Sequence, residues 1–441
     1  MDYIQQILFA IVLLIFVFLI GKRVGVIRRS IGLGKDYEPQ GSTSERFRSM
    51  LLIAFGQKKM FKRPLPAIFH FFIYAGFLII NLEVLEFIID GLAGTHRFFS
   101  PWLGSLYGLL MNFFEFLAVA VLISCVVFLF RRNIVRVPRF TSREMKGWPA
   151  LDGNLILIIE CVLMLAILSM NASDQLLQGS NPHYPETGKL MFSSLLIPLF
   201  EGLNESGLVI VERAAWWFHI VGILAFALYV THSKHLHIFM AFPNTWYSRF
   251  DAKGKMDNMP VVTNEVYSML GLPSPSGEVA AEGEVPRFGA RDVTDLSWKN
   301  IMEAYACTEC GRCTSECPAS QTGKLLSPRA IMMAVRDRAE ELALKKADER
   351  DDGRSLLNGF ITKEEVNACT SCNACVEACP VNINPLEIIL ELRRYSAMEE
   401  SSSPQAWNMM FQNIETSFSP WKFPPTERFN WASDLKKESN D

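Results

Sequence analysis

The chain has 441 residues, of which half are hydrophobic, and its formal net charge is −3. A chain without a basic excess is not typical of proteins that bind nucleic acid, so no such partner is expected. Long apolar runs fill residues 1–242, whereas the remainder is polar and charged. We therefore predict a membrane domain at residues 1–242, followed by soluble segments.

Five apolar runs are each about long enough to cross a bilayer as a helix. They cover residues 4–20, 65–89, 105–130, 155–170 and 214 to about 239. Lys22 and Arg23 follow the first run, whereas a cleaved signal peptide carries its positive charges before the apolar run, so we expect a retained helix. Residues 190–211 are interrupted by Pro198 and Gly202 and are interpreted as an external loop with a short interfacial helix.

The basic residues between the runs predict the orientation. Residues 21–63 and 131–149 together carry 17 Lys and Arg, whereas residues 91–104 and 171–213 carry three. Basic loops stay in the cytoplasm, which places the N-terminus outside and everything after the fifth run inside. We predict a multi-pass protein of the prokaryotic cytoplasmic membrane, surrounded by lipid.

Two cysteine runs, CTECGRCTSECP and CTSCNACVEACP, follow the pattern C-x2-C-x2-C-x3-C-P that holds [4Fe–4S] clusters. In such pairs the fourth cysteine of each run binds the cluster of the other run. The first cluster is assigned to Cys307, Cys310, Cys313 and Cys379, and the second to Cys369, Cys372, Cys375 and Cys317. Two structural zinc sites are the alternative, but zinc requires neither the duplication nor the trailing Cys-Pro. The remaining Cys125 and Cys161 are interpreted as core residues.

Histidines in the apolar runs suggest haem b. His219 and His237 are 18 residues apart, which is five turns or about 27 Å along a continuous helix. Their depth allows His70 to meet His235 or His237 but not His219, and the five-turn spacing favours His237. We expect one inner haem b with axial histidines, and a second, outer haem at His219 is left open. The alternative is that these are hydrogen-bonded interfacial histidines, as we interpret His232.

Four acids also fall within the predicted spans, namely Glu83, Glu86, Glu115 and Glu160. Acids inside a membrane are costly and suggest a proton or quinone path. The alternative is that they pair with backbone groups or arginine, and the sequence does not decide between the two.

The soluble part is predicted to be helical. Residues 243–296 read as a linker with a short helix near 264–270, and residues 297–395 as a two-cluster ferredoxin domain. Its motifs are separated by 51 residues that contain a helix start at Ser327 and Pro328, and Pro385 opens a further helix. The tail, 396–441, keeps many aromatic residues and is expected to dock a partner, although packing on its own domain is the alternative. The fold class is therefore all-α: a five-helix transmembrane bundle followed by an α-helical ferredoxin domain.

These residues resemble known families. The first half resembles the gamma subunit of respiratory nitrate reductase, a five-helix cytochrome b, in which His70, His219 and His237 match three of four haem-ligand positions. The fourth position falls on Ile80, which leaves an outer haem without one ligand. The second half resembles the cluster subunit of heterodisulfide reductases and the iron–sulfur part of glycolate oxidase. Residues 50–435 together resemble the front of electron-transfer-flavoprotein:menaquinone oxidoreductases.

The resemblance implies an electron-transfer subunit that links a cytoplasmic redox partner to quinone. Relatives continue into cysteine-rich CCG modules, whereas the last cysteine here is Cys379. The expected partner is a separate CCG-domain protein or an electron-transfer flavoprotein. Two alternatives remain: a passive membrane anchor and relay without a quinone site, and an electron-transfer subunit of a heterodisulfide-reductase-like complex. The residues identify no catalytic group.

Overall fold

The computed structural model of the protein describes residues 3–252, 254–273 and 287–432. Within these ranges the ordered elements are helices and turns, and β-pairing is limited to two isolated bridges. The predicted all-α fold class is confirmed. The chain divides into two compact units, one made of residues 1–256 and 292–388, the other of residues 257–291 and 389–441.

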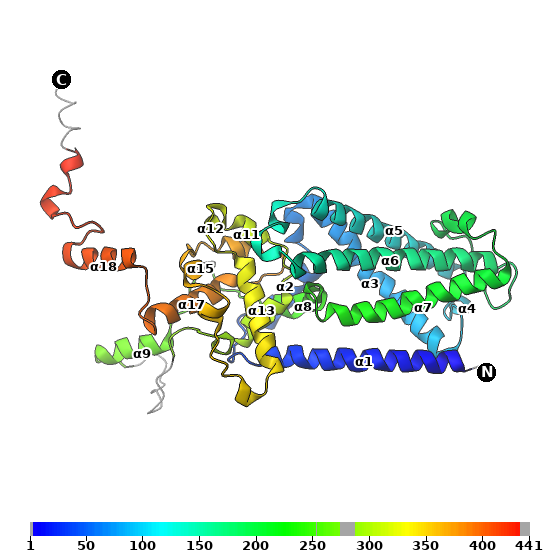
Figure 1. The fold of residues 1–441 in the computed structure, drawn as a ribbon, viewed down its shortest axis with the longest axis horizontal. Helices are drawn as coiled ribbons and strands as arrows, with labels where there is room; N and C mark the ends of the chain where they lie inside the picture. The colour runs from blue at the N-terminus through cyan, green and yellow to red at the C-terminus, as the bar shows by residue number, and fades with distance from the viewer. Residues whose placement is uncertain (1–2, 253, 274–286, 433–441) are drawn as a thin grey trace, which may run out of the picture. The chain divides into compact units, whose positions relative to one another are not determined.

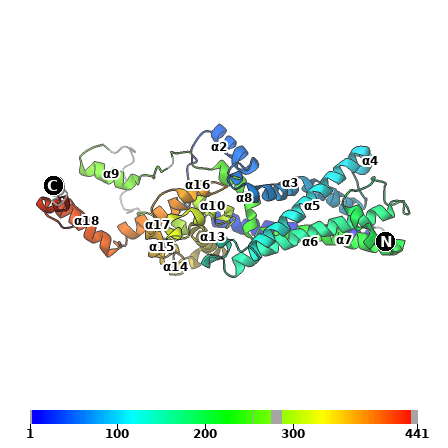
Figure 2. The same ribbon diagram turned by 90° about the horizontal axis from the view of Figure 1, so that it is seen from above.

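Five helices of the first unit are long and apolar enough to cross a membrane. They are α1 (Ile4–Ile31), α3 (Pro64–Ala93), α5 (Ser105–Asn133), α6 (Trp148–Leu177) and α7 (Glu205–Val230). Figure 1 shows the five helices running along one direction, and α3, α5, α6 and α7 lie together in Figure 2 as well. The first four exceed the apolar runs that predicted them, because polar turns extend these helices beyond the hydrocarbon region at their ends. The number of spans agrees with the prediction.

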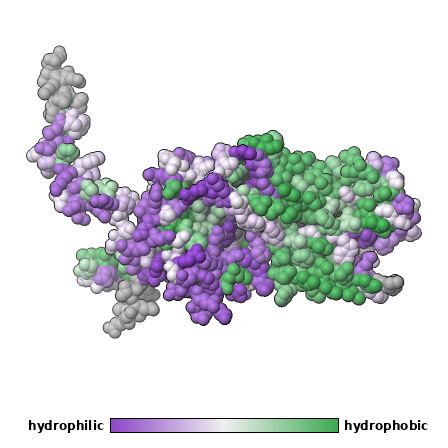
Figure 3. Space-filling model, viewed as in Figure 1, coloured by the Kyte–Doolittle hydropathy of each residue, from purple (hydrophilic) through white to green (hydrophobic). Residues whose placement is uncertain are grey.

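The bundle is built on α6, which packs against both α5 and α7, while α3 packs against α5. Side chains such as Ile80, Val121, Leu163 and Phe226 form its main core. Helix α1 lies at the edge, against α3 and α7, and most of its side chains are exposed. Figure 3 shows hydrophobic residues covering the outer surface of the bundle, as expected where lipid replaces water.

The fifth span differs from its prediction at both ends. Helix α7 begins at Glu205, nine residues before the predicted start, with the Asn204 side chain accepting a hydrogen bond from Gly207 N. It ends at Val230, and the 3₁₀ turn η6 (Lys234–Leu236) separates it from α8 (His237–Trp246). The prediction that His219 and His237 share one continuous helix is therefore wrong. The break is stabilised by Asp152, which accepts hydrogen bonds from Tyr229, Ser233 and the Lys234 backbone.

The cysteine-bearing segment packs on the end of the bundle where α3 and α6 begin (Figure 1). It contains α10 (Trp298–Ala306), α11 (Arg312–Glu316), α13 (Pro328–Leu344) and α16 (Ala374–Ala378). Helix α1 contacts both α10 and α13, and Arg23 forms an ion pair with Glu340 at 2.8 Å. As predicted, Ser327 caps α13 by accepting a hydrogen bond from Ala330 N, and Pro328 occupies its first turn.

The second unit contains α9 (Pro260–Met269), the end of α17 (Pro385–Met398) and α18 (Gln405–Ser417). The short linker helix is thus present but begins four residues earlier than predicted, at Pro260. Most of the Pro-, Gly- and Glu-rich stretch of the predicted linker lies outside the described residues. Six tail aromatics are exposed, which gives no support to packing on their own unit: Phe411, Phe418, Trp421, Phe423, Phe429 and Trp431.

Candidate redox cofactor sites

The two cysteine loops have the same backbone shape. Two residues after the first cysteine of each run, Glu309 and Ser371 have positive φ angles of 54° and 56°. Two residues further on, Gly311 and Asn373 have φ angles of 69° and 61°, and each precedes a one-turn helix, α11 or α16. Left-handed residues at alternate positions turn the chain around a centre, so that successive cysteines of one run face the same space.

The structure arranges the eight cysteines in two groups that cross between the runs. Cys307, Cys310, Cys313 and Cys379 line one small cavity, and we call them the proximal group. Cys317, Cys369, Cys372 and Cys375 are assigned to the distal group, because, besides burial, the charges of the other three thiols all contribute to raising the pKa of Cys375. Within the described residues, no three Cys, His, Asp or Glu side chains converge on a point suited to a single metal ion.

The surroundings of the thiols suit a multi-iron cluster. Burial, with the neighbouring thiolates, raises the pKa of both Cys307 and Cys375 to about 12. Such thiols need a bound metal cation to exist as thiolates, and cluster iron supplies that charge. Backbone N–H groups of Ser371 and Ile383 donate to the sulfurs of Cys369 and Cys379 at 3.4 and 3.3 Å. Donors of this kind stabilise bound thiolates and tune cluster potentials.

His70 on α3 and His237 at the start of α8 face each other with ring centres 6.5 Å apart. A metal–imidazole bond measures about 2.0–2.1 Å, and each ring centre lies about 1 Å further away, so two imidazoles on one metal ion have centres about 6 Å apart. His237 Nδ1 lies 3.2 Å from the Lys234 carbonyl oxygen. A contact of this type orients an imidazole for ligation through its other nitrogen.

The other two predicted histidines lie around the same space. The ring of His235 is 5.4 Å from that of His237, so it is a neighbour of the pair. His219, on α7, is fully buried, and its Nδ1 lies 3.0 Å from the Leu163 carbonyl oxygen while its Nε2 has no partner in the described structure. An imidazole oriented through one nitrogen could bind a metal through the other, but no second imidazole faces His219 in the described structure, where Phe87 is its aromatic neighbour.

A cavity of about 440 Å³ connects these residues. It is lined by all four predicted histidines, by Ile80 and Glu160 within the bundle, and by Glu309 and Cys310 of the cysteine-bearing segment. Its volume lies within the range of cofactor sites, roughly 300–1,000 Å³. One continuous space thus extends from His219, past His70 and His237, to the proximal cysteine group.

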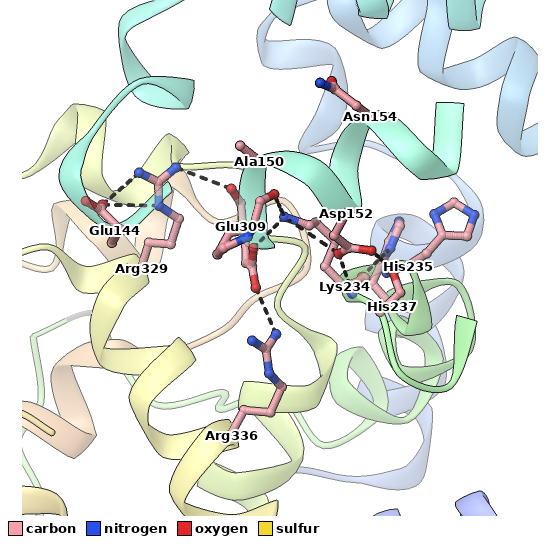
Figure 4. Close-up of polar contacts among 12 residues, drawn as sticks. Glu144, Ala150, Asp152, Asn154, Lys234, His235, His237, Glu309, Arg329 and Arg336 are labelled. Carbon is pink, nitrogen blue, oxygen red and sulfur yellow. Dashed lines mark hydrogen bonds and ion pairs between the residues drawn. The ribbon is translucent and has the colours of Figure 1, made fainter. Parts of the chain in front are cut away.

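Beside this cavity, a buried ionic network joins the membrane bundle to the cysteine-bearing segment (Figure 4). Lys234 Nζ lies 2.5 Å from Glu309 Oε2 and 3.8 Å from Asp152 Oδ2, and Glu309 also pairs with Arg336 on α13 at 2.9 Å. Burial alone would raise the pKa of Glu309, but the charges of Arg336 and Lys234 outweigh burial and hold this pKa below its usual range. Nearby, the fully buried Arg329 pairs with Glu144 at 2.7 Å.

Sequence reasoning missed this network. Lys234 and Glu309 are single charged residues in polar contexts, and neither stands out in the sequence. The signal that could have found Glu309 is its position between two cluster cysteines, where a buried charge requires a partner. No comparable signal marks Lys234 or Arg329.

The acids within the spans have different surroundings. Glu86 accepts hydrogen bonds from Tyr107 and Phe99 N, and Glu115 accepts them from Asn171, Phe192 N and Ser193 N. The backbone partners of Glu86 and Glu115 match the alternative in which acids of the spans pair with backbone groups instead of forming a proton or quinone path. Glu160 lines the cavity, and Glu83 is buried with an oxygen that has no partner in the described structure.

Comparison with known proteins identifies the cysteine-bearing segment. Residues 301–383 match the 4Fe-4S dicluster domain. The segment is therefore an iron–sulfur domain rather than a pair of zinc sites. No solved structure matches the chain.

Curated relatives cover most of this chain. "Probable iron-sulfur-binding oxidoreductase FadF" of Bacillus subtilis is 27% identical over 452 residues, covering 95% of this chain and 59% of the relative. "EtfAB:quinone oxidoreductase" of Syntrophomonas wolfei is 25% identical over 419 residues, covering 89% of this chain and 54% of the relative. A subunit of the dihydromethanophenazine:CoB–CoM heterodisulfide reductase of Methanosarcina mazei is 28% identical over 155 residues, covering 33% of this chain and 37% of the relative. The chain thus spans little more than half of the first two relatives, and the predicted resemblance to these iron–sulfur oxidoreductases is confirmed.

Proposed function

We propose that the chain is a membrane-anchored subunit that transfers electrons between a cytoplasmic redox partner and the quinone pool. It uses two [4Fe–4S] clusters, held by the proximal and distal cysteine groups, and a haem b held by His70 and His237. When bound, these groups supply one-electron carriers, and the protein supplies their spacing, burial and electrostatics. The observation that carries the proposal is the pair of facing imidazoles in a cavity that reaches Cys310.

The exposure of the cysteines supports an order of transfer. Cys372 of the distal group is exposed, whereas Cys307 and Cys379 of the proximal group are buried and Cys310 of that group lines the cavity that holds the histidines. A soluble partner would therefore meet the distal cluster first. The proximal cluster would lie between it and the haem.

The same arrangement supports a membrane topology. The cysteine-bearing segment packs on the bundle end that carries the basic loops, because Glu144 and Ser142 of the loop after α5 contact Arg329. Basic loops are cytoplasmic, so the clusters would face the reducing compartment. We extend this to a multi-pass protein of the prokaryotic cytoplasmic membrane with its N-terminus outside.

The iron–sulfur chemistry of the site and the names of the relatives suggest the kind of redox partner. One relative is named for EtfAB and quinone, and others are named as heterodisulfide reductase subunits. An electron-transfer flavoprotein or a CCG-domain protein would then meet the first unit near Cys372. In the second unit, the exposed tail aromatics would offer a partner apolar contact area.

Reduction of the purified protein tests the function. With haem and clusters present, a menaquinol analogue is expected to reduce the haem band, and a soluble low-potential donor to reduce both the clusters and the haem. If the donor reduces both while the quinol analogue never changes the haem spectrum, the quinone step fails. The alternative of a relay without its own quinone site would then be favoured.

A further inference from the structure

Four arginines line the cytoplasmic end of the cavity, beside His70 and the proximal cysteine group: Arg131, Arg132, Arg139 and Arg312. We call them the arginine cluster. Three lie at the end of α5 or in the loop after it, and the fourth, Arg312, stands between Cys310 and Cys313. The transmembrane half and the iron–sulfur half therefore contribute to one charged wall.

These arginines lack carboxylate partners. No ion pair joins any of the four to an acid among the described residues. Arg312 is 5% exposed and donates only to the Lys59 and Met60 carbonyl oxygens and to Met60 Sδ. Arg139 keeps a buried Nε without a partner in the described structure.

The acids of the cavity do not balance this charge. Among the described lining residues, the acids are Glu160 and Glu309. Glu309 already pairs with Lys234 and Arg336, and Glu160 belongs to α6 within the bundle. Neither acid therefore forms an ion pair with the arginine cluster in the described structure.

An unpaired buried guanidinium is costly, and a planar fork of N–H groups matches a carboxylate. We propose that the arginine cluster binds the propionate carboxylates of the inner haem. This inference rests on the proposed haem at His70 and His237. Arg131, Arg132 and Arg139 would contribute to this carboxylate site from the transmembrane half, and Arg312 from the iron–sulfur domain. The iron–sulfur domain therefore completes the haem site.

Two other anions share this chemistry, the thiolate-ligated cluster near Cys310 and an acidic lipid head group. The inference selects the propionates because the four guanidinium groups line the same cavity as the two histidines. Redox titration of the purified full-length protein separates the cluster from the haem, since each is followed by its own spectrum.

Arg139→Gln and Arg312→Gln are expected to lower the midpoint potential of the haem. Loss of a positive charge beside a propionate disfavours the reduced haem by about tenfold, which is ~59 mV for one electron. The cluster spectra should remain unchanged. Arg139→Lys keeps the positive charge, so its haem midpoint potential should lie close to that of the unaltered protein. Arg136→Gln is the matched control, because Arg136 follows α5 as Arg139 does but is exposed and outside the cavity lining.

A second measurement removes the propionate charge itself. Haem-free full-length protein should bind iron protoporphyrin IX more tightly than its dimethyl ester, by at least about tenfold, and Arg139→Gln should reduce that preference. Equal binding of acid and ester by the unaltered protein would overturn the inference, as would variants that shift only the cluster potential. A protein purified without any haem and unable to take it up would overturn the haem proposal and this inference together.

Discussion

Lys234 Nζ lies 2.5 Å from Glu309 Oε2, and through this contact the turn that carries His237 is attached to the loop that carries Cys307 and Cys310. The Lys234 backbone takes part as well, because its carbonyl oxygen lies 3.2 Å from His237 Nδ1. One residue thus contacts both the imidazole and the cysteine loop. We therefore expect its position to influence the spacing of the two proposed cofactor sites.

Replacing Lys234 with methionine should slow electron transfer between the clusters and the haem. The side chain keeps its length but leaves Glu309 buried with one fewer cation, and the loop is expected to shift. A small misplacement of reacting groups can cost roughly tenfold to a hundredfold. Rapid-mixing measurements of haem reduction after cluster reduction would show this, with haem and cluster content unchanged.

Lys345→Met is the control for that change. Lys345 pairs with Asp352 at 2.6 Å within the iron–sulfur domain and does not line the cavity. An equal slowing in both variants would show that Lys234 has no special position in the transfer.

His70→Ala and His237→Ala should each abolish the b-type absorption of the inner haem, because a six-coordinate iron needs both imidazoles. The pyridine haemochrome content of purified protein measures the loss. His232→Ala is the control, since this histidine is exposed. If His219→Ala also removes part of the haem, the second, outer haem is present. A full haem complement in His70→Ala would disprove the axial pair.

Cys379→Ser should remove the cluster of the first cysteine run and not that of its own run. The proximal group contains Cys379 together with Cys307, Cys310 and Cys313. The remaining electron paramagnetic resonance signal should therefore match that of Cys307→Ser and differ from that of Cys369→Ser. A signal identical to the Cys369→Ser one would mean that each run binds its own cluster.

Glu144→Gln should loosen the contact between the loop after α5 and the start of α13. Arg329 is fully buried, and Glu144 is its carboxylate partner at 2.7 Å in the described structure. Breaking a buried pair typically costs about 3–5 kcal/mol, and the 15% exposure of the Glu144 side chain places the expected loss at or below the lower end. Faster amide hydrogen exchange in both segments at neutral pH would show it, with Glu341→Gln as a more exposed control on α13.

The pH dependence of this pair has a defined sign. Burial alone would raise the pKa of Glu144, but hydrogen bonds from Ser327 and Arg329 outweigh burial and lower this pKa below its usual 4.5. The pair therefore contributes its full stability above pH 4.5 and loses it as the pH falls through the lowered value. Exchange in the unaltered protein should approach that of Glu144→Gln only in strong acid, and convergence near neutral pH would contradict the pairing.

Several features were predictable because local patterns determine them. The five spans follow from apolar runs of bilayer length, and the start of α13 follows from Ser327 and Pro328. The iron–sulfur domain follows from the cysteine spacing. The continuous helix through His219 and His237 was wrong, because apolar residues resume after the short polar stretch 231–235, while Asp152, distant in sequence, stabilises a break there.

The kind of chemistry could be read from residue types alone: sulfur ligands at cluster spacing, histidines in apolar helices and basic residues at one end of the bundle. These signals depend on short spacings along one segment. The folded chain was needed to find that His70 faces His237, that Lys234 meets Glu309 and that four arginines line one cavity. Each of these contacts joins segments many residues apart, and its geometry depends on how whole helices pack.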